Sequence, residues 1–96
     1  MSRVVVVGAG LSGLSAACHL LANGHEVTVV EREAGPGGCN GVLRADGFTF
    51  DTGPTVLTMP GLLERPLQRI GGSLEALGLR RLDPGYRAFF ADGSRI

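Results

Sequence analysis

The sequence predicts an α/β fold that begins with a parallel β-α-β unit and continues with a β-hairpin and short helices. An apolar, β-branched run at residues 4–7 leads into the motif Gly-Ala-Gly-Leu-Ser-Gly at residues 8–13. A helical pattern then continues to Asn23, and a second apolar run at residues 27–30 ends at Glu31. Strand, glycine turn, helix, strand and acidic residue are, in this order, the parts of a dinucleotide-binding β-α-β unit.

Each glycine of the motif has a physical role in such a unit. Gly8 allows the tight turn out of the strand, Gly10 lets the backbone approach a pyrophosphate, and Gly13 lets the helix pack close to the strand. The phosphates then lie at the helix N-terminus, where free N–H groups and the positive end of the helix dipole point at them. Glu31 is placed to accept hydrogen bonds from an adenosine ribose. Because a carboxylate repels a 2′-phosphate, NADP is the least expected ligand.

The residues around the motif agree with this interpretation. Val4 and Val6 alternate before it, Val27 and Val29 alternate in the second strand, and Gly24 is placed to end the helix. A β-α-β unit that binds nothing is the alternative, and the agreement of all the flanking signals disfavours it.

Length and composition restrict the function further. Ninety-six residues make at most one domain, and a formal net charge of zero without a basic stripe argues against a nucleic-acid partner. The early apolar run at residues 4–7 is far shorter than the roughly 20 residues that a membrane span needs. No signal peptide follows it, so we expect a cytoplasmic protein. Cys18 and Cys39 lack metal-ligand spacing, and a disulfide between them is not expected in the cytoplasm.

The sequence also predicts which parts of the first strand and helix are buried. The β-branched run at residues 3–7 is typical of a parallel strand covered on both faces. On the helix at residues 11–23, Cys18 is expected to be a small buried residue and His19 to lie on the exposed side. A loop is expected over residues 32–41.

The second half of the chain predicts short elements separated by turns. Asp46-Gly47 indicates a hairpin between strands at residues 42–45 and 48–51, and residues 52–55 form another turn. The apolar stripe of residues 60–70 predicts a helix, in which Pro66 should cause a kink or a division into two helices.

Beyond residue 70, a short helix and further strands are expected. Ser73 is placed to cap a helix that ends at Gly78. Strands are expected at residues 79–82 and 86–91, followed by a hairpin turn at Asp92-Gly93. Because the chain stops three residues later, we expect a piece of a longer protein, whether a truncated product or a fragment of a longer reading frame.

Two further motifs resemble known flavoproteins. Glu31-Arg32 followed after four residues by Gly37-Gly38 resembles the second signature shared by amine oxidases, protoporphyrinogen oxidases and carotenoid desaturases. Residues 50–60, Phe-Asp-Thr-Gly-Pro-Thr-Val-Leu-Thr-Met-Pro, closely resemble bacterial phytoene desaturases and their carotenoid-desaturase relatives. Shorter matches at residues 82–84, 86–87 and 90–93 extend the resemblance over essentially the whole chain.

The resemblance implies that residues 1–96 are the N-terminal part of a Rossmann-like FAD/NAD(P)-binding domain, an incomplete domain without its substrate domain. It implies FAD as the tightly held cofactor, with residues 8–13 at the pyrophosphate, Glu31 at the ribose and the turn at 51–55 towards the flavin. The implied cofactor-binding residues are Gly8, Gly10, Leu11, Ser12, Gly13, Glu31, Arg32, Gly37, Gly38 and Thr55.

The implied reaction removes two hydrogens from a saturated C–C bond of a carotenoid precursor such as phytoene, and a hydride passes to the flavin. Such an apolar isoprenoid substrate implies peripheral association with the inner face of the cell membrane. The sequence identifies no catalytic residue, because Asp51 is the only acid in a promising loop and its position also fits a turn-capping role.

The chain departs from the family pattern at two positions. Cys39 follows the glycine doublet where the family has an arginine, and Pro66 stands where a helix former is expected. We interpret Cys39 as a substitution without chemical function rather than as a redox or covalent site, because no basic residue lies near it in sequence to lower the pKa of its thiol. These departures keep a non-catalytic remnant open as an alternative. An amine-oxidase-like flavin oxidase is a further alternative, and an NAD-dependent dehydrogenase is the least favoured because it has no use for the doublet.

Overall fold

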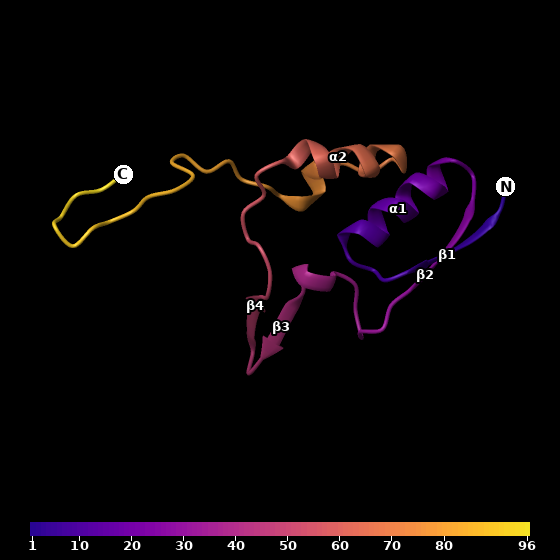
Figure 1. The fold of residues 1–96 in the computed structure, drawn as a ribbon, viewed down its shortest axis with the longest axis horizontal. Coiled ribbons are helices and arrows are strands. Elements are labelled where there is room, and N and C mark those ends of the chain that lie inside the picture. Colours follow the sequence, from indigo (N-terminus) through magenta and orange to yellow (C-terminus); the bar gives the residue numbers. More distant parts are fainter.

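The computed structural model describes residues 1–96 and opens with the predicted β-α-β unit (Figure 1). Strand β1 (Arg3–Val7) and strand β2 (Glu26–Val30) pair in parallel, with Val5 opposite Thr28. Helix α1 (Leu11–Ala22) connects them and packs on one face of the pair. The parallel pair and its crossover helix are the arrangement that the alternating valines and the glycine motif predict.

The two strands are covered on one face only. In both strands half-buried residues alternate with exposed ones, and the half-buried residues are Val4, Val6, Val27 and Val29. On the other face Val5 is 63% exposed and Val7 84% exposed. The prediction of strands covered on both faces is therefore wrong for this chain, because α1 covers one face and the chain supplies no element to cover the other.

Three residues are buried, and they mark where the chain packs most closely. Ala9 lies in the glycine turn, Ala17 lies on α1, and Pro66 lies on helix α2 (Pro60–Arg69), which packs against α1. Cys18 is half-buried rather than fully buried. The small size of Ala9 and Ala17 lets backbone segments approach each other at these points.

The hairpin lies where the sequence predicts it. Strand β3 (Val42–Ala45) pairs antiparallel with strand β4 (Phe48–Asp51). Asp46 and Gly47 both have positive φ, at 52° and 82°. Two successive positive φ values are the signature of a type I′ turn, whose twist matches that of the flanking strands. Just before the hairpin, the predicted loop contains one short 3₁₀ helix, η1 (Gly38–Asn40).

Helix α2 is a single helix that contains Pro66. Of the two predicted outcomes, the division into two helices is therefore wrong. Proline lacks an N–H, so the carbonyl of Leu62, four residues earlier, loses its usual helical partner. Burial of Pro66, in a helix that packs against α1, offsets part of that loss. The following helix is the 3₁₀ helix η2 (Leu74–Leu77), and it ends at Gly78 in the left-handed conformation, as predicted.

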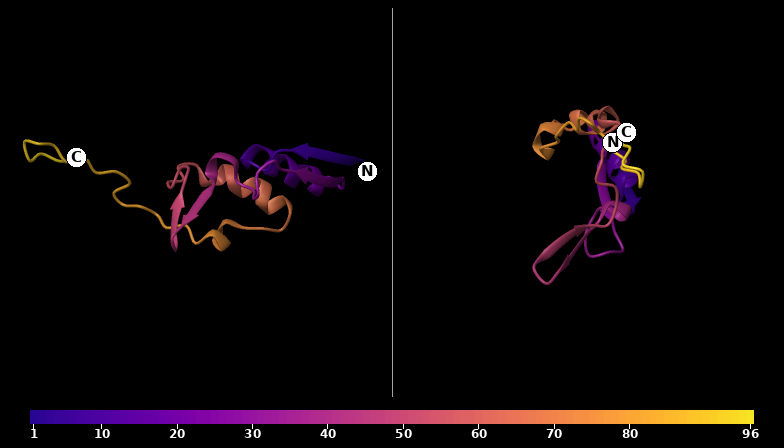
Figure 2. Two further views of the ribbon diagram at one scale, coloured as in Figure 1. Left: turned by 90° about the horizontal axis from the view of Figure 1, so that it is seen from below. Right: turned by 90° about the vertical axis from the view of Figure 1, so that its left-hand side faces the viewer.

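The last part of the chain extends away from the rest (Figures 1 and 2). No regular strand forms at residues 79–82 or 86–91, but an antiparallel bridge joins Phe89 to Arg95, and backbone hydrogen bonds between residues 88 and 96 and between residues 90 and 94 close the predicted turn. A lone pair of short strands without a packing partner gains too little burial to form a regular ladder. The radius of gyration of 17.7 Å exceeds the roughly 13 Å of a compact domain of this size. None of the helices has the length and apolar character needed to cross a bilayer.

Candidate nucleotide-binding site

The glycine turn is held close to both strands and to α1. The N–H of Gly8 donates to the carbonyl of Val30 at 2.7 Å, and Gly8 has a φ of +100°. A Cβ on Gly13 would overlap the carbonyl oxygen of Gly8 and come within 3.4 Å of a Val6 methyl group. Glycine at position 13 is therefore what permits α1 to start so close to β1, as the motif predicts.

The N-terminus of α1 presents unpaired donors. Gly10 is its N-cap in an extended conformation, and the first turn contains no acidic residue. The first backbone hydrogen bond of the helix runs from Leu14 to Gly10, so the N–H groups of residues 11–13 have no acceptor within the chain. Unpaired N–H groups at the positive end of a helix dipole are suited to bind phosphate.

The glycine doublet lies directly against this turn. The N–H of Gly37 donates to the carbonyl of Ala9 at 2.8 Å. A Cβ on Gly38 would come within 3.1 Å of the Cα of Gly10, and Gly38 has a φ of +58°. Any side chain at position 38 would therefore be strained and would press on the turn. Two glycine motifs that lie about 25 residues apart in sequence thus form one surface.

An open pocket of about 430 Å³ lies between the two motifs. Seven of the ten predicted cofactor-binding residues line it, and all seven come from the turn, the start of α1 or the doublet. The lining residues are Val7, Gly8, Gly10, Leu11, Ser12, Gly13, Gly37, Gly38, Cys39 and Asn40. A lining of backbone and glycine with free N–H donors fits the pyrophosphate of a dinucleotide, which needs close backbone approach.

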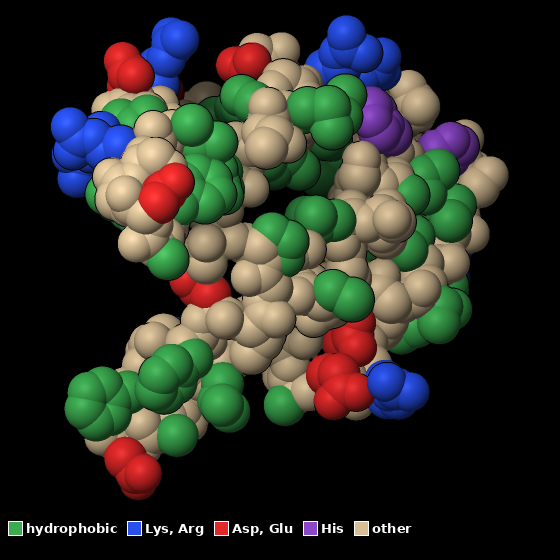
Figure 3. Space-filling model, turned by 60° about the vertical axis from the view of Figure 1, so that its left-hand side comes forward, with side chains coloured by type: hydrophobic (Ala, Val, Ile, Leu, Met, Phe, Trp, Pro, Cys, Tyr) green, Lys and Arg blue, Asp and Glu red, His purple; other side chains and the backbone are tan.

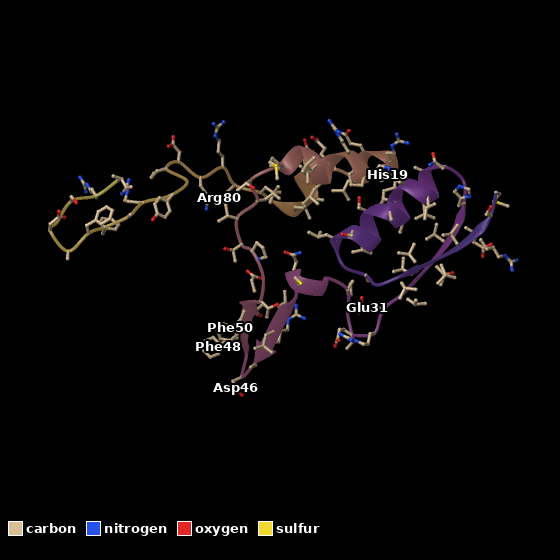
Figure 4. All side chains as sticks on the ribbon, viewed as in Figure 1. His19, Glu31, Asp46, Phe48, Phe50 and Arg80 are labelled. Carbon is tan, nitrogen blue, oxygen red and sulfur yellow. The ribbon has the colours of Figure 1, made fainter.

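Glu31, labelled in Figure 4, does not line the pocket, but its carboxylate is hydrogen-bonded to the glycine turn. One carboxylate oxygen accepts a hydrogen bond from the N–H of Ala9 at 2.6 Å, and the other accepts one from the N–H of Glu33 at 2.9 Å. The hydrogen bonds from Glu33 and Ala9 lower the pKa of Glu31, since they favour the charged carboxylate. The carboxylate predicted at the ribose is thus ionised and fixed beside the turn.

The other two predicted residues lie away from the pocket. The side chain of Arg32 is 92% exposed and pairs with Glu33 at 3.0 Å, and Thr55 is exposed in the irregular segment after β4. The turn before Thr55 does reach the doublet, because the N–H of Thr52 donates to the carbonyl of Gly41 at 3.0 Å. A Cβ on Gly53 would overlap the carbonyl oxygen of Cys39.

Several lining residues escaped sequence reasoning. From the sequence, Cys39 stands out only as a departure from a family pattern, yet it lines the pocket next to Asn40. Their place in the sequence could have predicted this. Because the glycine doublet lies on the turn, the two residues that follow it border the same pocket. Ala9 does not line the pocket, and the sequence gives no sign that its N–H donates to Glu31.

Comparison with known proteins agrees with this geometry. The family model described as NAD(P)-binding Rossmann-like domain matches residues 6–70. The phytoene dehydrogenase of Streptomyces griseus is 58% identical over 97 residues, and the zeta-carotene-forming phytoene desaturase of Myxococcus xanthus is 46% identical over 95 residues. These matches cover 100% and 98% of this chain but 19% and 18% of the two relatives, so the chain spans about a fifth of their length. They confirm the predicted resemblance to carotenoid desaturases.

A solved structure agrees as well. A Pyrococcus furiosus protein of known crystal structure is 33% identical, with a TM-score of 0.62. The match covers 99% of this chain and 24% of that protein. The family model accounts for the glycine turn, α1, β2, the doublet, the hairpin and α2. The chain belongs to the NAD(P)-binding Rossmann-like domain family.

Proposed function

We propose that this chain binds FAD and forms the N-terminal, nucleotide-binding part of an oxidoreductase that dehydrogenates a carotenoid precursor such as phytoene. One observation carries the proposal, namely the contact between the glycine doublet and the Gly-x-Gly-x-x-Gly turn around a backbone-lined pocket. A simple NAD-dependent dehydrogenase has no use for this doublet. The identities of 58% and 46% to a phytoene dehydrogenase and a phytoene desaturase support the substrate class.

In this proposal, different residues of the chain bind different parts of the cofactor. The free N–H groups of residues 11–13 hold the pyrophosphate, while Gly37 and Gly38 leave room for it. The carboxylate of Glu31 retains lone pairs beyond its two backbone hydrogen bonds, and these can accept hydrogen bonds from the ribose hydroxyls. The same negative charge disfavours a 2′-phosphate and therefore NADP.

When bound, FAD supplies the acceptor for the hydride that leaves the substrate. The chain's own contribution is binding and orientation, since no carboxylate, imidazole or amine side chain lines its pocket. A polyene substrate of this class is apolar and resides in the bilayer. We therefore also propose that the protein works from the cytoplasmic side, at the inner face of the cell membrane.

A chimera tests the proposal. Residues 1–96 replace the matching segment of the Streptomyces griseus phytoene dehydrogenase, and cells that supply phytoene are analysed for more desaturated, coloured products. We expect products from the chimera and none from a chimera carrying Gly10→Val, because a side chain there blocks the approach of the pyrophosphate. A soluble, flavin-containing chimera that makes no product would refute the desaturase assignment.

A second candidate is a nucleotide-binding segment without catalysis. The observation that favours it is the burial of only three of the 96 residues, which gives the chain little packing of its own. The same chimera separates the two candidates, because a non-catalytic remnant predicts no product even when flavin is retained.

A further inference from the structure

A second and larger cavity, of about 570 Å³, lies between α1 and α2. It shares no lining residue with the nucleotide pocket. We call it the α1–α2 cleft, and its lining residues are Ser15, His19, Leu62, Arg65, Pro66, Gln68 and Arg69. Figure 4 shows His19 where α1 approaches α2. The expectation that His19 lies on an exposed face of its helix is wrong, because α2 packs beside it and half-buries it.

The polar lining residues form two facing rows. Arg65 and Arg69 lie one turn apart on α2, and Ser15 and His19 lie one turn apart on α1. Residues four apart share one face of a helix, so each pair points into the cleft together. Figure 3 shows Arg and His side chains next to each other on one face of the molecule.

The cleft has no acidic counterpart to these cations. No carboxylate lines it, and the two ion pairs of the chain use Arg3 with Glu26 and Arg32 with Glu33. Arg65 and Arg69 therefore bring two permanent positive charges to adjacent turns of one helix without a partner. Like charges at this spacing repel each other, and an anion between them removes that repulsion.

The donors match one kind of anion. Guanidinium groups bind the oxygens of phosphate through paired N–H donors. Ser15, His19 and Gln68 add a hydroxyl, an imidazole and an amide around the same space. Leu62 and Pro66 contribute apolar surface beside these donors, while Arg65 and Arg69 are exposed and accessible to a ligand from solvent.

We propose that the α1–α2 cleft binds a phosphate group. That group can belong to a soluble phosphate ester or to an anionic lipid headgroup at the membrane surface. The proposal does not depend on FAD binding, because the two cavities are separate.

The test titrates the 96-residue chain with inorganic phosphate by isothermal titration calorimetry, and measures flotation of the chain with phosphatidylglycerol-containing vesicles against pure phosphatidylcholine vesicles. The test variant is Arg65→Gln with Arg69→Gln. The matched control is Arg44→Gln with Arg87→Gln, which removes the same charge outside the cleft. We expect the test variant to weaken binding at least about tenfold, since bonds to charged groups are lost, and the control to bind like the original chain.

Each outcome decides the matter. Binding of inorganic phosphate shows that a soluble phosphate group is sufficient, and binding only to the anionic vesicles identifies the lipid headgroup. Absence of both in the original chain, an equal loss in the control, or a chain without helical circular dichroism would overturn the proposal. A test variant that still binds phosphate or anionic vesicles like the original chain would also overturn the proposal, whether or not it keeps its helicity. FAD titrations of the same proteins test the nucleotide pocket separately, and we expect them to be unaffected by either variant.

Discussion

The carboxylate of Glu31 accepts a hydrogen bond from the backbone N–H of Ala9 at 2.6 Å. Glu31 follows β2, and Ala9 stands between the first two glycines of the turn that follows β1. The bond therefore ties the end of one parallel strand to the turn at the end of the other. It fixes the turn before any ligand arrives, and less conformational entropy is then lost on binding.

Replacing Glu31 by glutamine should weaken FAD binding about tenfold, because a neutral amide forms weaker hydrogen bonds than a carboxylate with the N–H of Ala9 and with the ribose. Quenching of flavin fluorescence on titration measures the affinity. Glu33→Gln is the matched control, since it removes the same charge from a surface ion pair. Equal affinities for the two variants would show that Glu31 has no special role.

The stability of the chain should fall at acid pH through Glu31. Hydrogen bonds from Glu33 and Ala9 hold its pKa below the ordinary value of 4.5. A carboxyl whose pKa is lower in the folded state stabilises that state above the unfolded pKa and stops doing so as the pH falls through the folded value. Below pH 4.5 the thermal midpoint should therefore fall more steeply for the original chain than for Glu31→Gln. Asp92, whose pKa is lowered by Ser94, titrates in both proteins and cancels in the comparison. Parallel curves would contradict the assignment.

Two helical glycines should respond in opposite ways to alanine. Gly13→Ala places a Cβ onto the carbonyl oxygen of Gly8, so the start of α1 must shift, at a cost of about 1–3 kcal/mol. Gly61→Ala, on α2, meets open space and should stabilise its helix by up to about 1 kcal/mol. Thermal unfolding followed by circular dichroism measures both. Similar effects of the two substitutions would mean that α1 does not pack as described.

Cys39→Arg should strengthen FAD binding. The position borders the pocket and is exposed, and the family pattern has an arginine there. A new hydrogen bond from a charged donor to cofactor phosphate is worth about 1.5–3 kcal/mol, or roughly ten- to a hundredfold in affinity. Cys39→Gln, a long neutral side chain, is the control and should bind like the original chain. No gain with arginine would show that position 39 does not face the phosphates.

Local signals predicted the β-α-β unit and the hairpin correctly. The alternation of Val4 and Val6, and the adjacent Asp46 and Gly47, each determine structure through their immediate neighbours. The approach of Gly37 and Gly38 to the turn was implied only by resemblance, because nothing in local sequence brings segments so far apart together.

Errors arose where tertiary packing decides the outcome. Pro66 remains inside one helix because it is buried against α1, and His19 lines a cleft because α2 covers it. The strand expected at residues 86–91 does not form, since its β propensity has no surface on which to pack. Arg32 and Thr55 rest on resemblance alone, and because neither lines this pocket, their contact with the cofactor stays a prediction.

The decisive measurement is a visible absorbance spectrum of the 96-residue chain, refolded with FAD and then desalted. If the turn, the doublet and Glu31 form a flavin site, the desalted chain will retain yellow flavin, and the Gly10→Val variant will not. The proposed site would be contradicted by a folded chain that emerges colourless, or by a Gly10→Val variant that retains as much flavin as the original chain.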